Sequence, residues 1–254
     1  MDPLSGLRTV VGDPAAGWES AAEQPRPDPL GAGRGEPELF AASPGAGALE
    51  LLDHQRPLGE QDAGELAATV EHWRERMRAQ PGAAYVHLWS DAERAHLHAL
   101  PFVPARVARE RERFSAYRDR TQGRNLQADL LQAEVRARAR VVSVGADAVA
   151  LCPFASEAPF HVQLLPRAER AAFEDDGPAG AETLHEVLAR LAAVDAGPPR
   201  LWVRTAPPDA TTFCWRIDIV PGARPADGLE AGAGVHLNAL APEEAAERLR
   251  ATLR

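Results

Sequence analysis

The spacing of hydrophobic residues along the chain predicts where helices and strands lie. Leu66, Val70, Trp73 and Met77 recur at spacings of three and four, which is typical of a helix that buries one face. This helix is expected over 61–80, and Pro81 and Gly82 end it. The same criterion predicts further helices over 105–122, 126–138, 179–194 and 242–253.

Alternating polar and apolar residues, bounded by turn residues, predict the strands. An apolar run over 85–89 leads through a polar turn at 90–94 into a second strand over 96–102, where His96 and His98 stand two residues apart. Prolines stop this second strand before the charged helix begins. Other strands are expected over 8–11, 48–52, 140–144, 148–151, 161–165, 200–204 and 213–220, with a short extended piece over 232–238.

The order of these elements indicates an α+β fold that is built twice. A strand–turn–strand–proline unit occurs over 85–104 and again over 200–221. We therefore predict two halves, 1–138 and 139–254, each an antiparallel sheet with packed helices. Within the first half, 13–48 is rich in Pro, Gly, Ala and acidic residues and lacks periodicity, so we expect a loose loop there.

Composition excludes several functions. A net charge of −9 argues against a general nucleic-acid binder, which needs a basic footprint. No apolar run is long enough for a membrane span, and the first residues lack the pattern of a signal peptide, so a cytoplasmic location is expected. The 28 basic residues are all Arg, which excludes a Schiff-base lysine and a P-loop lysine.

The cysteines and tryptophans favour structural roles. Two cysteines, Cys152 and Cys214, cannot make a disulfide framework or a cysteine-based zinc site. Burial as a small apolar residue is the favoured interpretation of Cys152. Four tryptophans within predicted elements favour core packing over ligand stacking, and these are Trp73, Trp89, Trp202 and Trp215.

Four motifs occur in the order in which a known family has them. They read ALPFVPARVARERE at 99–112, CPFASEAPFHVQLLPR at 152–167, RTAPPDATTFCWRIDIVP at 204–221 and GAGVHLNALAPEEAAERLR at 232–250. The chain therefore resembles the galactose-1-phosphate uridylyltransferases, which are two-repeat members of the histidine-triad superfamily. The resemblance covers 85–254 and the opening DPLSG. It implies two histidine-triad-like halves with a trimmed N-terminal half, and a homodimer.

In that family a histidine within H-P-H-x-Q attacks the α-phosphate of a sugar nucleotide and carries the nucleotidyl group covalently. Counting backward without gaps from the ALPFVP motif places 92–96 on H-P-H-x-Q, so Arg94 stands at the nucleophile and His96 at the glutamine. Arginine stays protonated and cannot attack phosphorus. In this register the covalent mechanism is lost.

Two alternatives to this register stay open. Keeping His96, Leu97 and His98 as the H-x-H makes His98 the nucleophile, at the cost of a four-residue deletion before Leu100. Alternatively, His96 and His98 do no more than face one side of a strand, as residues two apart do.

The resemblance also implies metal positions that this chain does not fill. The family's structural zinc needs a C-x-x-C, which is missing here, although His54 falls near a histidine of that site. At the second metal site Glu110 matches the glutamate, but the three histidine positions read Arg204, Cys214 and Arg216. Two guanidiniums repel a metal, so we expect neither zinc nor iron. Ion pairs of Arg204 and Arg216 with Glu110 and Asp218 are expected instead.

These observations predict a uridylyltransferase-like protein that has lost its nucleophile and metal sites and binds at most a sugar nucleotide or hexose phosphate. Arg94 and His96 are the expected ligand contacts, with His236 and Asn238 from the region that resembles the family's hexose-phosphate loop. One alternative is an active nucleotidyltransferase or phosphohydrolase that uses His96 or His98. Another is a dimeric structural or regulatory protein without a small-molecule site.

Overall fold

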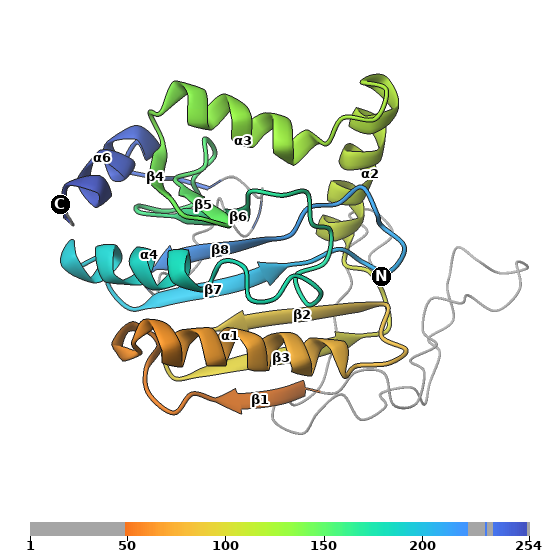
Figure 1. The fold of residues 1–254 in the computed structure, drawn as a ribbon, viewed down its shortest axis with the longest axis horizontal. Coiled ribbons are helices and arrows are strands. Elements are labelled where there is room, and N and C mark those ends of the chain that lie inside the picture. The colour runs from red at the N-terminus through yellow and green to blue at the C-terminus, as the bar shows by residue number, and fades with distance from the viewer. Residues whose placement is uncertain (1–48, 223–231, 233–235, 253–254) are drawn as a thin grey trace, which may run out of the picture.

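The computed structural model describes residues 49–222, 232 and 236–252 (Figure 1). The strand expected at 8–11 and the loop expected at 13–48 lie outside the described residues, as does part of 232–238. Among the described residues, no helix combines the length and the apolarity that crossing a membrane requires.

The described strands form one antiparallel sheet, which confirms the predicted α+β class. Its order is β1-β3-β2-β7-β8-β6-β5-β4. Pairing of β2 with β7 joins the strands of the first predicted half to those of the second. The strands are β1 (Leu49–Asp53), β2 (Tyr85–Ser90), β3 (Arg94–Leu100), β4 (Val141–Val144), β5 (Ala148–Leu151), β6 (Val162–Pro166), β7 (Pro199–Arg204) and β8 (Arg216–Pro221).

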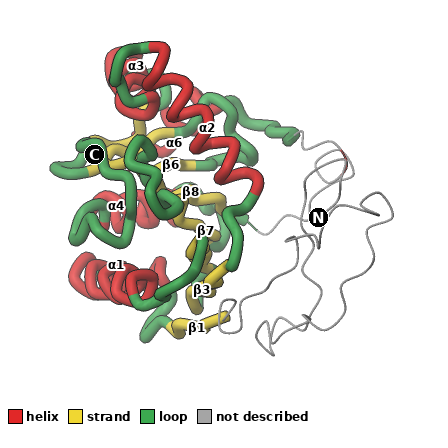
Figure 2. Tube along the Cα trace, turned by 90° about the vertical axis from the view of Figure 1, so that its right-hand side faces the viewer, coloured by secondary structure: helices red, strands yellow, loops and turns green. Residues whose placement is uncertain are grey.

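Helices cover both faces of this sheet. One face packs against α1 (Ala63–Arg78), α4 (Ala181–Ala193) and α6 (Pro242–Thr252), whose apolar residues belong to one core cluster. The other face carries α2 (Ala105–Arg120) and α3 (Leu126–Ala137). Figure 2 shows α1 and α4 on one side of the strands and α2 on the other.

The main core is built on an apolar row that crosses five strands. Leu97, Leu88, Val203, Ile217 and Leu164 are successive cross-strand partners, and each is almost completely buried. Because side chains alternate between the faces of a strand, the neighbours of these residues must point toward α2 and α3. The apolar row therefore fixes which residues form the opposite, polar face.

Helix α1 agrees with its predicted pattern, whereas strand β8 starts later than predicted. Helix α1 buries Leu66, Val70, Trp73 and Met77, as their spacing predicts. The sequence predicts that the last strand begins at residue 213, but β8 begins at Arg216. The backbone just before Arg216 leaves the sheet, since the Trp215 N–H donates to the Arg170 carbonyl. Residues 213 and 214 instead join a small apolar cluster with α2.

Candidate functional site

A row of polar and aromatic side chains crosses the sheet on the face toward α2. His96, Trp89, Trp202, Asp218 and Gln163 are cross-strand partners in successive strands from β3 to β6. We call these five residues the polar row. The candidate functional site is built on this row and on the residues beside it in the same strands.

At the β3 end of the polar row, an indole ring orders two imidazoles. The rings of Trp89 and His96 stack with centroids 3.9 Å apart and planes 5° from parallel. The Trp89 indole N–H donates to Nε2 of His98 over 3.2 Å, so this nitrogen carries a lone pair and the imidazole is neutral. Trp89 and Trp202 are partly exposed on this face, whereas the other two tryptophans expected in the core, Trp73 and Trp215, are fully buried.

The surroundings of these histidines favour their neutral forms. Burial lowers the pKa of His98 below the ordinary histidine value, and the neighbouring His96 adds to this effect. Burial also lowers the pKa of His96, although the Asp91 carboxylate acts in the opposite direction. His87, the cross-strand partner of His98, has its pKa lowered to about 4 by burial and by the Arg204 charge. All three imidazoles are therefore neutral near pH 7.

Arg94 is the first residue of β3 and shares a strand face with His96. Its Nε lies 3.3 Å from Oδ1 of Asp53, the residue opposite it in β1, and both side chains are exposed. Nε2 of His96 lies 3.8 Å from the Asp91 carboxylate and has no hydrogen-bond partner among the described residues. His96 thus has a free, neutral nitrogen, whereas Arg94 has no lone pair.

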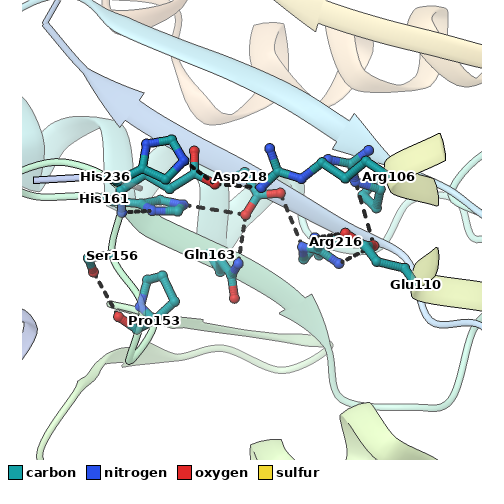
Figure 3. Close-up of polar contacts among 11 residues, drawn as sticks. Arg106, Glu110, Pro153, Ser156, His161, Gln163, Arg216, Asp218 and His236 are labelled. Atoms are coloured by element: carbon teal, nitrogen blue, oxygen red, sulfur yellow. Dashed lines mark hydrogen bonds and ion pairs between the residues drawn. The ribbon is translucent and has the colours of Figure 1, made fainter. Parts of the chain in front are cut away.

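Beyond the aromatic rings, α2 meets the sheet through buried ion pairs (Figure 3). Nη1 and Nη2 of Arg216 donate to the two oxygens of Glu110 over 3.1 and 3.0 Å. Nε of the same side chain donates to Oδ2 of Asp218 over 3.1 Å. Arg204 adds a third contact, with its Nε 3.7 Å from Oε2 of Glu110. The ion pairs expected from the sequence are confirmed.

The ion pairs keep Asp218 and Arg216 charged. Burial by itself would raise the pKa of Asp218, but the Arg216 charge and a hydrogen bond from His161 outweigh it, and this pKa lies well below its usual range. Burial would likewise lower the pKa of Arg216, but Asp218 and Glu110 raise it. The network contains the carboxyl groups of Glu110 and Asp218 and the guanidinium groups of Arg204 and Arg216, so its formal charges cancel.

The network does not fit a metal ion. Both Glu110 oxygens accept hydrogen bonds from one guanidinium, so neither is directed at an empty coordination position. A divalent ion would add a buried double charge to a group that is already neutral. Cys214, which the family resemblance placed at this site, lies instead in the apolar cluster with Phe114 and Phe213.

The position that corresponds to the family's structural zinc also lacks a ligand set among the described residues. Nδ1 of His54 donates to the Ala92 carbonyl over 3.2 Å, and its Nε2 lies 3.5 Å from the Ser90 hydroxyl. Burial lowers the pKa of His54 despite the nearby carboxylates. No group of three or more His, Cys, Asp or Glu side chains within the described ranges is placed to hold a metal.

Two residues of this site were not assigned a role from the sequence. His161 accepts the Glu157 backbone N–H at Nδ1, so its Nε2 carries the proton that faces Oδ1 of Asp218 at 3.4 Å. Gln163 donates to the same oxygen over 2.7 Å. The alternation in β6 and β8, which puts Gln163 and Asp218 on one face, is the sequence signal that could have identified this pair.

The predicted ligand contacts fall at opposite ends of the polar row. Nε2 of His236 lies 3.9 Å from the Glu157 carboxylate, which also binds Arg106 of α2, and Asn238 donates to the Ser156 carbonyl. These contacts lie beside β6. Arg94 and His96 lie on β3, four strand spacings or roughly 19 Å away across the sheet.

Comparison with solved structures identifies the fold. A galT-like protein from Arabidopsis thaliana aligns with a TM-score of 0.71 and 18% identity, over 81% of this chain and 75% of that one. An ADP-glucose phosphorylase from Arabidopsis thaliana, solved with bound ADP-glucose, aligns with a TM-score of 0.68 and 19% identity, over 78% of this chain and 68% of that one. A uridylyltransferase aligns with a TM-score of 0.69 and 19% identity, over 82% of this chain and 75% of that one. The chain therefore has the galT-like fold that its motifs predict.

No protein-family model matches the chain, and no curated protein sequence matches it either. The similarity is visible in the fold and in short motifs.

Proposed function

We propose that this chain is a uridylyltransferase-like protein that does not form a covalent nucleotidyl intermediate and that binds at most a sugar nucleotide or a hexose phosphate. The shared fold supports the ligand class, since one structure of that fold holds ADP-glucose. Fold alone does not establish activity, so the chemistry of the site must carry the rest of the proposal. As the resemblance implies, the proposed protein is a homodimer.

The observation that carries the proposal is the guanidinium at position 94. A residue that attacks phosphorus at neutral pH needs a lone pair, as a neutral imidazole has. Arg94 has none, and it is paired with Asp53 at the exposed start of β3. The ungapped match of the sequence motif places this residue where the nucleophile of the family stands. The proposed chain keeps the scaffold of the site and lacks its nucleophile.

The aromatic part of the polar row is the proposed ligand-binding surface. Trp89 and Trp202 are neighbours across two strands and are partly exposed, and aromatic rings pack well against a base or the apolar face of a sugar. The indole of Trp89 is already ordered by His96 and His98. A preformed surface loses less side-chain entropy when a ligand binds.

His96 supports a second candidate function, an active transferase or hydrolase. Its imidazole is neutral near pH 7, and its Nε2 makes no hydrogen bond within the described part of the chain. Nε2 of His98 already accepts the Trp89 N–H. Of the two Nε2 atoms, only that of His96 is without a hydrogen bond among the described residues, but it is buried, so an attack on phosphorus would require this side chain to move.

Binding and turnover can be measured on the same samples. UDP-glucose and ADP-glucose are titrated into the protein by calorimetry, and the nucleotides are then separated chromatographically, with and without added hexose phosphate. The proposal predicts binding without a new nucleotide. Turnover that His96→Asn abolishes and the exposed control His72→Asn retains would establish the second candidate. A dimer in light scattering that neither binds nor converts these ligands would refute both in favour of a structural role.

A further inference from the structure

One buried guanidinium joins two carboxylates that come from different elements. The Arg216 side chain is 11% exposed, that of Glu110 is 16% exposed and that of Asp218 is 5% exposed. All three nitrogens of the guanidinium donate, two to Glu110 of α2 and one to Asp218 of β8 itself. The positive charge is thus enclosed by oxygens from a helix and a strand.

The rest of the network cannot replace this charge. Arg204 approaches Glu110 only to 3.7 Å, and its Nε has no hydrogen-bond partner among the described residues. His161 and Gln163 donate to the other carboxylate as neutral groups. Without Arg216, two largely buried carboxylates would share one poorly placed cation. Buried carboxylate oxygens in such numbers are the donors that a hard cation prefers.

We propose that the Arg216 guanidinium is a resident cation, which fills a cation site formed by Glu110 and Asp218 and keeps divalent metal ions out of it. The site requires positive charge, and the bulk of the side chain is secondary. An arginine tethered to β8 thereby fastens α2 to the sheet without a metal. This inference does not depend on which ligand, if any, the polar row binds.

A second buried arginine provides a matched control. The Arg74 side chain is fully buried, but its hydrogen bonds go to the backbone carbonyls of Phe173 and Ala179. The carboxylate of Glu71 is 3.9 Å away and only partly buried. Truncating Arg74 removes comparable packing but leaves no enclosed pair of carboxylates. The two variants therefore separate a requirement for charge from a requirement for volume.

The test compares Arg216→Ala with Arg74→Ala by thermal unfolding. Arg216→Ala is expected to lower Tm on the order of 10 °C, because removing one partner of a buried pair leaves uncompensated charge. Millimolar ethylguanidinium, or Mn²⁺ in a separate sample, is expected to restore at least half of this loss in Arg216→Ala. The same additions should leave Tm of the wild-type protein and of Arg74→Ala unchanged.

Metal binding is tested directly by Mn²⁺ calorimetry. One Mn²⁺ is expected to bind Arg216→Ala, none is expected at this site in the wild-type protein, and adding Glu110→Gln to Arg216→Ala should abolish binding. A folded Arg216→Ala that neither cation restores would overturn the proposal. So would equal restoration of Arg74→Ala, or Mn²⁺ binding to the wild-type protein that Glu110→Gln removes.

If Arg216→Ala does not accumulate in folded form, the refolding yield from urea replaces Tm as the readout. The yield should rise with ethylguanidinium for Arg216→Ala and not for Arg74→Ala. An unchanged yield would count against a resident cation. Arg216→Lys, which keeps the charge but cannot donate to both carboxylates in the same geometry, is expected to lie between the wild-type protein and Arg216→Ala.

Discussion

His87 is expected to make the protein sensitive to mild acid. Its imidazole lies on the polar face of β2, opposite His98 in β3. Burial lowers its pKa from 6.5 to about 4, and the Arg204 charge acts in the same direction. The folded protein therefore holds His87 neutral under conditions in which the unfolded chain protonates it. Replacing His87 with Gln removes this titration and keeps a polar side chain of similar size.

The sign and size of the effect follow from the two pKa values. Because the folded-state pKa is the lower one, the unfolded state binds more protons, and stability falls as pH decreases from 6.5 toward 4. At pH 5 the unfolded histidine is almost fully protonated and the folded one is mostly neutral. The resulting loss in the free energy of unfolding is about 2 kcal/mol relative to neutral pH.

Urea unfolding at pH 7.5 and pH 5, followed by circular dichroism, measures this loss. The wild-type protein should lose about 2 kcal/mol more than His87→Gln between the two conditions. His72→Gln, which removes an exposed histidine of α1, should behave as the wild-type protein does. Equal losses for the wild-type protein and His87→Gln would show that the folded state does not hold His87 neutral, and the described electrostatics of this face would be wrong.

Three further substitutions test the fold around the site. Asn125→Ala removes the side chain that accepts the first N–H groups of α3 and should lower the free energy of unfolding by about 1 kcal/mol in urea. Asn125→Asp, which keeps the cap but loses the amide donor to the Thr212 carbonyl, should cost less. Trp215→Ala removes a fully buried indole and should cost about 4 kcal/mol in the same assay. Arg250→Ala frees the Val141 carbonyl of the edge strand β4 and should increase aggregation in light scattering, unlike the exposed α6 control Arg248→Ala.

Local periodicity was sufficient to predict most of the elements. The apolar spacing in α1, the apolar run in β2 and the alternation in β3 depend only on neighbouring residues, and the structure confirms the three elements. The ion pairs of Arg216 with Glu110 and Asp218 were expected for another reason, since the family resemblance places Glu110, Arg204 and Arg216 at one metal site. Periodicity alone could not have brought α2 and β8 together.

The polar row could not be predicted, because it depends on strand register. Trp89 and Trp202 are more than a hundred residues apart, and only the β2–β7 pairing makes them neighbours. The position of Cys214 was also wrongly predicted, because it depends on the path of the chain outside the sheet. The motif match placed Cys214 beside Arg204 and Arg216, but the chain leaves the sheet just before Arg216, and Cys214 packs into the apolar cluster with Phe114 and Phe213.

The intact mass of the protein after incubation with UDP-glucose tests the central claim most directly. Because Arg94 cannot attack phosphorus, the protein should keep its unmodified mass, whether or not it binds the nucleotide. The sample must stay near neutral pH, because phosphohistidine-type bonds are lost in acid. An added uridylyl group that peptide mapping places on His96 or His98 would contradict the account, since it would show that the site still carries out covalent transfer.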